Sequence, residues 1–275
     1  MSAAISNYGP IEAWDVSAVE LFNRLFVDDN NSALPGADTF NADISEWDVS
    51  RGTSFYRMFG YAYQFNQDIS SWDVSRGTSF SDMFYYARSF NQDISGWVLS
   101  SGGSFGRMFL GADEFNQDIS GWDVSRGTSF YAMFYSANEF NQDISQWDVS
   151  RGTDFRFMFT NEFNQNLCAW GEHYSSDKNY ASMFGYSDCP DTSDPTGVSG
   201  PWCQSCVVSV RSMPGFWVIL DEKIVELPKF NITLFFSVCP NQSTHEATDP
   251  STNPASHWPA NQIQPDEATD PPSNP

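Results

Sequence analysis

The sequence predicts an α/β repeat solenoid, a stack of short parallel strands and short helices. Three observations lead to this prediction. The segment FNQDISSWDVSRGTSFSDMF begins at Phe65, and close copies begin at Phe40, Phe90, Phe115 and Phe140, a step of twenty-five residues each time. Within each copy, an apolar spacing typical of a strand is followed by one typical of a helix. The end units depart from this template, as terminal repeats of a stack do.

The predicted strand begins at an aliphatic residue of each unit. In one copy Ile69 is followed three residues later by Trp72 and two further on by Val74. This spacing ends in period two, which predicts a short strand with one buried face. It is also the strand spacing of a leucine-rich repeat. The aligned first residues are Ile11, Ile44, Ile69, Ile94, Ile119, Ile144 and Leu167, so we count seven units.

The predicted helix follows a Ser-Arg-Gly turn signal. Phe80, Met83, Phe84 and Ala87 are spaced i, i+3, i+4 and i+7, which places one apolar stripe on a short helix, and Ser79 can cap its start. One unit buries too little apolar surface to offset the cost of ordering it, so neighbouring units must stack. We therefore expect parallel strands about 4.8 Å apart and a continuous core of Phe, Ile, Trp, Val and Met columns.

Four segments follow from the changes in composition. Residues 1–190 form the solenoid, and 191–206 form a turn-rich cap that contains cysteine. Residues 207–239 form a small β-rich segment of unknown role, with a hairpin expected in FWVILDEKIVEL and further strands at 207–210 and 232–238. Residues 240–275 are rich in Pro, Thr, Ser and Asn and predict a disordered linker.

The charge excludes some partners. The net charge of −22, with only 17% charged residues, argues against nucleic acid and leaves cations, basic partners or carbohydrate. No apolar run approaches the roughly 18–20 residues of a membrane span. The N-terminus has neither the basic nor the apolar region of a signal peptide. We expect a monomer or part of a larger chain.

The outward strand positions form the candidate binding strip, which we call the aspartate–serine strip. Its residues are Ser71, Asp73, Ser75, Asp123, Ser125, Asp148 and Ser150. Stacked like charges repel, so something must compensate the aspartates. Three interpretations are ion pairs with the arginines three residues later, a ligand-facing polar strip, and calcium. Both charges are missing together at Val98 and Ser101, which favours pairing with arginine. No other metal and no cofactor is predicted.

Two further polar or aromatic sets have an ordinary structural explanation. The Asn-Gln-Asp runs, such as Asn66–Asp68, predict local turn hydrogen bonds, and the alternative is a ridge that binds glycan or cation. Several tyrosines take free positions of the predicted helices and could contact sugar or protein, although scattered surface rings are common. They are Tyr56, Tyr61, Tyr63, Tyr85, Tyr86, Tyr131 and Tyr135.

The cysteines predict disulfides in the C-terminal third. Cys168 and Cys189 flank the last unit, where a bond would staple the terminal coil. Cys203 and Cys206 resemble a redox motif, but they follow a turn-rich segment without a βαβ unit, so a structural disulfide is the better account. The histidines give no four-ligand zinc spacing. Candidate glycosylation sequons begin at Asn30, Asn231 and Asn241.

Over residues 11 to about 190, the repeated FNQDISSWDVS…MF unit resembles the BspA-like repeat, a leucine-rich-repeat-like module of surface proteins. The resemblance implies a curved right-handed solenoid on a secreted or surface-anchored protein that serves in adhesion or ligand binding. Family units usually carry an aliphatic residue where this chain has Gly52, Gly77, Gly103 or Gly127, so a looser turn is expected there.

These observations predict a non-enzymatic binding or adhesion module, extracellular or at the cell surface, whose ligand is a protein or a glycan. No nucleophile–base pair stands out, and identical repeats offer carboxylates identical environments, unlike a hydrolase pair. One alternative is a structural spacer or coat protein without a specific ligand. A lesser alternative is thiol–disulfide chemistry at Cys203 and Cys206.

Overall fold

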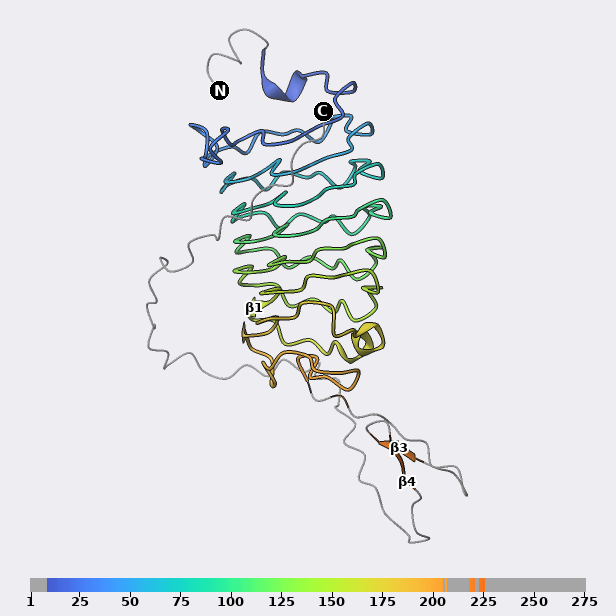
Figure 1. Cartoon of the computed structure of the whole chain (residues 1–275). Helices are drawn as coiled ribbons and strands as arrows, with labels where there is room; N and C mark the ends of the chain where they lie inside the picture. Colours follow the sequence, from blue (N-terminus) through green and yellow to red (C-terminus); the bar gives the residue numbers. More distant parts are fainter. Residues whose placement is uncertain (1–8, 205, 207–217, 221–222, 226–275) are drawn as a thin grey trace, which may run out of the picture. The chain divides into compact units, whose positions relative to one another are not determined.

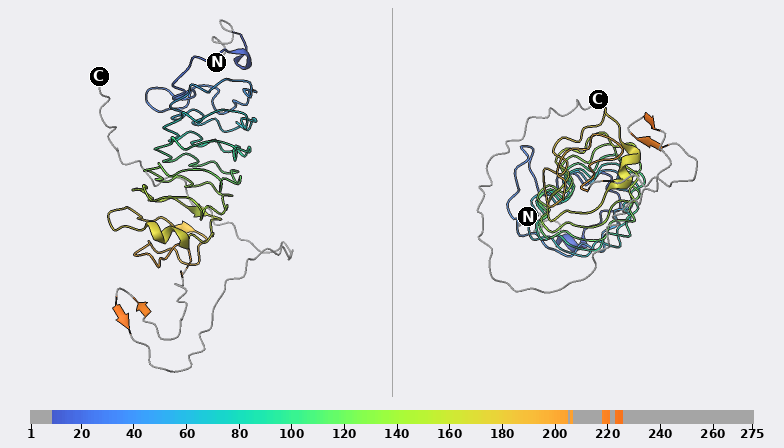
Figure 2. Two further views of the ribbon diagram at one scale, coloured as in Figure 1. Left: turned by 90° about the vertical axis from the view of Figure 1, so that its right-hand side faces the viewer. Right: turned by 90° about the horizontal axis from the view of Figure 1, so that it is seen from below.

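The computed structural model describes residues 9–204, 206, 218–220 and 223–225. The chain divides into two units, Met1–Arg211 and Ser212–Pro275. In the first unit, successive copies of the twenty-five-residue repeat form coils that lie one on top of the next (Figure 1). Seen from below, the coils overlie one another around a shared interior (Figure 2). The predicted stack of repeats is confirmed. We call each coil a rung.

The described residues contain little regular secondary structure. The 3-10 helices are η1 (Ile11–Ala13) and η2 (Cys168–His173). Strands β1 (Thr160–Asn161) and β2 (Tyr186–Ser187) pair in parallel. In the second unit, β3 (Val218–Leu220) and β4 (Lys223–Val225) pair antiparallel, where the sequence predicts a hairpin. The strands predicted at 207–210 and 232–238, and the linker predicted at 240–275, lie outside the described residues.

The predicted core columns are confirmed. Phe80, Met83 and Phe84 of one rung are fully buried, and so are their equivalents in the neighbouring rungs. The rings form columns between rungs: the Phe80 and Phe105 centroids are 5.8 Å apart, with the ring planes 4° from parallel. Each rung therefore packs mainly against the rungs above and below it, as in other one-dimensional repeat proteins.

The predicted helices are not formed: no α-helix occurs among the residues that the structure describes. From Phe80 onward the chain makes consecutive turns, in which Met83 N–H donates to Phe80 O (3.2 Å). The intervening donors go to the next rung, as Phe84 N–H does to Met108 O (2.8 Å). Since every second donor bonds sideways, an i→i+4 helix cannot form. The turns still bury i, i+3, i+4 and i+7, which is why the pattern resembled a helix.

The strands predicted at the Ile-Trp-Val segments are also not formed. There the chain makes two turns per rung, closed by Trp97 N–H to Ile94 O (3.1 Å) and Gly102 N–H to Leu99 O (2.7 Å). The parallel bridges lie instead at the residue before the first Phe of the turn run, which the sequence suggested as a helix cap. They join Leu21 to Ser54, and then Ser54, Ser79, Ser104, Ser129, Asp154 and Asn179 in succession.

The tryptophans join the rungs through hydrogen bonds of their side chains. Ile94 O accepts the backbone N–H of Trp97 in its own rung (3.1 Å) and the indole N–H of Trp122 in the next (3.0 Å). Both lone pairs of a buried carbonyl are thereby used. The same indole bond to the preceding unit is made by Trp47, Trp72, Trp97, Trp122, Trp147 and Trp170.

The glycines after the Val-Ser-Arg segment mark tight packing, not the looser turn expected from their departure from the family pattern. A Cβ at Gly77 would lie 2.3 Å from the ring of Phe80 and 3.0 Å from Val74 O. Gly52 and Gly127 are packed against Phe in the same way. In the unit that follows Gly77, the glycine packed against Phe is Gly102, not Gly103. Any side chain here would displace a ring of the core.

Two disulfides close the C-terminal end of the stack. Cys168 is bonded to Cys206, and Cys189 to Cys203. The four cysteines predicted to form disulfides do so, but the predicted pairings, Cys168 with Cys189 and Cys203 with Cys206, are wrong. The observed bonds attach the segment 191–206 to the last rungs, where Trp202 is buried. A bond between Cys168 and Cys189 would join only residues of the last unit, and a bond between Cys203 and Cys206 only residues of the segment 191–206. Neither would attach that segment to the end of the stack.

Trp122→Phe tests the indole ladder. The variant keeps an aromatic ring but leaves Ile94 O with one hydrogen bond, so the free energy of unfolding in urea should fall by about 1–3 kcal/mol. Met133→Leu serves as the control, because it changes a buried side chain without removing a hydrogen bond. Equal losses in the two variants would mean that the indole bond contributes nothing specific.

Serine replacement of each cysteine pair tests the cap. The two bonds span sequence separations of 38 and 14 residues. Loop-closure entropy then predicts losses of about 4 kcal/mol for Cys168–Cys206 and about 3 kcal/mol for Cys189–Cys203. Urea unfolding of the two double variants measures this order, and unchanged stability in both would contradict a stapling role.

Candidate binding surfaces

The aspartate–serine strip is a column of local turns. Asp73, Asp123 and Asp148 are exposed, and the serines beside them are exposed or partly exposed. Each carboxylate accepts the backbone N–H of the serine two residues later, at 3.0 Å for Asp73, 3.1 Å for Asp123 and 2.9 Å for Asp148. These carboxylates therefore already have a partner in their own rung.

The predicted ion pairs between this column and the arginines three residues later are not formed. Arg51 bonds Glu20 instead, at 2.9 Å. Within the described part of the chain, Arg76, Arg126 and Arg151 make no ion pair. The aspartates are stabilised by Ser hydroxyl and backbone N–H groups, which reach them without crossing between rungs.

The pKa values of the strip reflect these local bonds. The Ser75 hydroxyl and backbone N–H hold the pKa of Asp73 below its ordinary value, while the charge of Asp48 on the neighbouring rung raises it. In the same way, Ser125 lowers the pKa of Asp123. The hydrogen bonds outweigh the repulsion between rungs, so the acidic column remains ionised at neutral pH.

One end of the strip contacts the C-terminal rungs but stays exposed. His173 Nε2 lies 3.7 Å from Asp148 Oδ1, and Lys178 Nζ donates to Ser150 O at 2.8 Å. No cluster of three or more His, Cys, Asp or Glu that could hold a metal occurs in the described ranges. The calcium interpretation of the aspartates thus gains no support from their geometry.

The Asn-Gln runs form a ladder between rungs, so the predicted local turn bonds are wrong for these two residues. Asn91 Oδ1 accepts the backbone N–H of Asn116 (3.0 Å) and the side-chain amide of Gln117 (2.8 Å) from the next rung. The prediction holds for the aspartate of the run, because Asp118 accepts Ser120 N–H (2.9 Å). With its amides bonded internally, this ridge is a structural seam.

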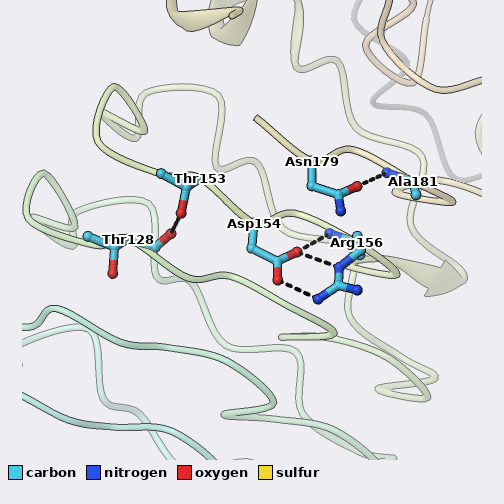
Figure 3. Close-up of polar contacts among 6 residues, drawn as sticks. All are labelled: Thr128, Thr153, Asp154, Arg156, Asn179 and Ala181. Atoms are coloured by element: carbon cyan, nitrogen blue, oxygen red, sulfur yellow. Dashed lines mark hydrogen bonds and ion pairs between the residues drawn. The ribbon is translucent and has the colours of Figure 1, made fainter. Parts of the chain in front are cut away.

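Threonines form another ladder between rungs. Thr153 Oγ1 donates to Thr128 O at 3.0 Å, and in the same region Asp154 binds Arg156 within one rung through two bonds of 3.0 and 2.8 Å (Figure 3). Asn179, which occupies the column of Asp154 one rung further on, accepts Ala181 N–H at 3.1 Å. A column can therefore change from charged to neutral between rungs without losing its local turn.

The tyrosines at the free positions cluster along the run of turns. We call Tyr56, Tyr61, Tyr63, Tyr85, Tyr86, Tyr131 and Tyr135 the tyrosine surface; all seven are partly exposed. Tyr61 and Tyr86, on adjacent rungs, have centroids 6.0 Å apart and planes within 5°. Tyr85 meets Tyr86 edge-on at 4.7 Å. The rings are held by one another, so they present a preorganised aromatic face to solvent.

Arginines lie among these rings. The Arg88 guanidinium is 4.6 Å from the Tyr63 centroid, and Arg156 is 5.0 Å from that of Tyr131. Arg57 lies 5.1 Å from the centroid of Tyr85. Cation–π contacts of this kind hold both partners in place. The tyrosine surface thus combines flat apolar faces with guanidinium donors, the two groups that recognise sugars and anions.

The sequence analysis missed a charged group beneath this surface. The carboxylate of Asp82 is 1% exposed and lies 3.3 Å from Arg57 and 3.1 Å from Arg107. Burial raises the pKa of Asp82, and the two guanidinium groups oppose this shift. The three residues stand twenty-five apart, so comparing charge signs down this one column would have revealed the pairing.

Other predicted site residues are dispersed. Cys203 is fully buried and Cys206 partly exposed, and each is bonded to a different cysteine. Asn30 is exposed in a loop closed by the bridge between Val27 and Ala33. Asn231 and Asn241 lie outside the described residues.

Fold and surface together define a repeat protein whose rungs are joined by tryptophan and Asn-Gln ladders, with aromatic side chains outside. The family whose model matches is described as "Mycoplasma protein of unknown function, DUF285", over residues 1–110 and 103–193. The chain belongs to this family. Neither the curated proteins nor the solved structures gave a match. Among the described helices, none has the length and hydropathy needed to cross a membrane.

Acidification tests the aspartate turns. Hydrogen bonds lower the folded-state pKa of these carboxylates, so their stabilisation is present above the unfolded pKa of about 3.9 and is lost as pH falls through the folded values. The urea midpoint should be constant above about pH 5 and fall below about pH 4. The residues concerned are Asp43, Asp48, Asp68, Asp73, Asp93, Asp118, Asp123 and Asp148.

Asp123→Asn provides the comparison, because the amide keeps an acceptor oxygen but does not titrate. Its midpoint should fall less steeply than that of the unsubstituted chain. A midpoint that rises on acidification would contradict the assignment. It would mean that protonation of Asp82, whose pKa is raised by burial, stabilises the fold more than protonation of the whole column destabilises it.

Proposed function

We propose that the chain is a non-enzymatic binding module of an extracellular or cell-surface protein, and that its ligand is a protein or a glycan. The tyrosine surface carries the proposal: partly exposed rings, fixed by mutual contacts and by arginines, lie on a repetitive scaffold. Exposed aromatic and arginine groups supply most of the binding energy in many interfaces. On this proposal the stack is a leucine-rich-repeat-type module of the BspA-like kind, which its repeat unit resembles.

The disulfides support the extracellular setting. Two bonds hold the cap, and such bonds form and persist in oxidising compartments. They also disfavour the redox alternative, because Cys203 and Cys206 are bonded to different partners and Cys203 is buried. A thiol–disulfide catalyst needs an accessible thiolate with a lowered pKa.

The second candidate function is a spacer or coat element without a specific ligand. The ladders between rungs favour it, because they explain most of the repeated polar residues as internal bonds. They do not explain the tyrosines, which vary from rung to rung and carry out no repeated structural role.

Retention on arrays of immobilised glycans and matrix proteins separates the two functions. A binding module should be retained saturably, and Tyr61→Ala/Tyr86→Ala should weaken retention by about tenfold, because the loss of two preorganised rings costs more than 1.4 kcal/mol. Retention no greater than that of a chain with a scrambled surface would establish the spacer.

Ser71→Ala/Asp73→Ala is the matched comparison on the aspartate–serine strip. If retention depends on the tyrosine surface, this variant should bind like the unsubstituted chain. A loss confined to Ser71→Ala/Asp73→Ala would move the binding site to the strip. Both variants remove contacts of the folded chain, so retention is measured below the melting temperature of each. A cooperative thermal melt then separates lost binding from lost folding.

A further inference from the structure

One column of the turn run concentrates positive charge. The residue two positions after the first Phe of each run is Arg24, Arg57, Asp82 and Arg107 in successive rungs. Arg57 and Arg107 both bond the single carboxylate of Asp82. With Tyr56 and Tyr85 these residues form what we call the arginine–tyrosine cluster.

The cluster has more cations than anions. The cluster contains three guanidinium groups and one carboxylate: Arg57 and Arg107 pair with Asp82, and Arg24 makes no ion pair within the described residues. Arg24 and Arg57 both lie over the ring of Tyr56, at 5.3 and 5.7 Å from its centroid. Two like charges beside one ring repel each other, so a nearby anion would stabilise the arrangement.

One donor of the cluster has no acceptor. The side chain of Arg57 is 9% exposed, and its buried Nη1 makes no hydrogen bond to any residue that the structure describes. The rings of Tyr56 and Tyr85 lie beside this guanidinium, but a ring face replaces a hydrogen bond only weakly. An unpaired buried donor destabilises the fold. Solvent does not reach this nitrogen, so the donors that a ligand can reach are those of Arg24 and Arg107, which are partly exposed.

We propose that the arginine–tyrosine cluster binds the carboxylate or sulfate groups of an acidic polysaccharide. The inference rests on the proposed binding function and names its ligand class. The planar fork of arginine matches carboxylate and sulfate oxygens, and the neighbouring tyrosine rings offer flat faces to sugar rings. The net charge of −22 does not prevent this, because physiological salt screens exposed charges beyond about 8 Å.

The backbone of the cluster favours a polysaccharide over an extended peptide. Phe55 N–H bonds Ser79 O (2.9 Å) and Arg57 N–H bonds Ser81 O (3.1 Å). These donors are used between rungs, so a peptide cannot add here as an extra strand. Recognition must come from side chains, and those present are rings and guanidinium groups. An acidic peptide is therefore the competing outcome of the test.

Calorimetric titration of the whole chain tests the proposal with four probes: a polyuronate, a sulfated glycosaminoglycan, neutral dextran and polyglutamate. One or both acidic polysaccharides should bind and dextran should not, and affinity should fall as salt rises from about 0.15 M to about 1 M. A preference between the polyuronate and the glycosaminoglycan identifies the anion as carboxylate or sulfate.

Arg24→Ala should weaken this binding by about tenfold, because it removes a charge-assisted contact. The matched control is Arg126→Ala, which removes the same charge from an exposed arginine outside the cluster. Arg24→Lys should lose part of the affinity, since it keeps the charge but not the fork. Arg24 is partly exposed and makes no ion pair within the described residues, so the melts of all three variants should stay close to that of the unsubstituted chain, apart from the lost contact of Arg24 with Tyr56.

Equal losses in Arg24→Ala and Arg126→Ala would overturn the proposal, because they would indicate nonspecific attraction. Binding of dextran as strong as that of the polyuronate, or tighter binding of polyglutamate, would overturn the ligand class. If no acidic polysaccharide binds while array retention persists, the inference fails and the proposed function stands. If array retention is also absent, both fail.

Discussion

The hydrogen bond from each indole to the isoleucine carbonyl of the preceding unit is the constraint on which the stack depends. It ties the register of one rung to the next, because the buried carbonyl must accept both its own turn N–H and the neighbouring indole. Tryptophan suits this position because its large apolar ring carries an N–H donor and no acceptor that would need a second partner. The first unit, from Ile11 to Ile44, is longer than the others, and its extra residues around Asn30 leave the stack as an exposed loop. The Trp47 indole still bonds Ile11 O at 3.1 Å across this loop, so the register is kept.

The buried columns could be predicted and the backbone could not, for one reason. Apolar spacing records which side chains face the interior, and a helix and a run of turns bury the same positions of Phe80–Ala87. The difference lies in the backbone: Tyr86 and, in the next rung, Arg107 take positive φ of 54° and 55°. Such values usually require glycine or asparagine, so neither residue signalled a turn. Hydrogen bonds between rungs stabilise a conformation that local propensity does not favour.

Charge explains which polar columns form ladders. Asn91 Oδ1 accepts the backbone N–H of Asn116 and the side-chain amide of Gln117 from the next rung, and the backbone N–H of Asn91 donates to Asn66 Oδ1 of the preceding rung. These side chains are neutral, so they stack without repulsion. A carboxylate only accepts, and stacked carboxylates repel, so Asp73 and Asp123 turn to serines of their own rungs. Arginine was therefore not needed as a counterion, which is why the ion pairs predicted for the strip did not form. Asp82 is different: it is buried, and a buried carboxylate requires cationic partners.

Regular and irregular columns have different capacities for recognition. A carboxylate or amide that recurs in successive rungs must find donors in each of them, so its acceptors are used within the fold, as those of the aspartate–serine strip and the Asn-Gln seam are. A column that changes between rungs escapes this requirement. The column of Tyr56 continues with Ser81, Gly106, Tyr131 and Arg156, and the column of Asp82 includes the partly exposed Arg24, which makes no ion pair within the described residues. Repetition therefore builds the scaffold, while the departures from it leave groups free to bind a ligand.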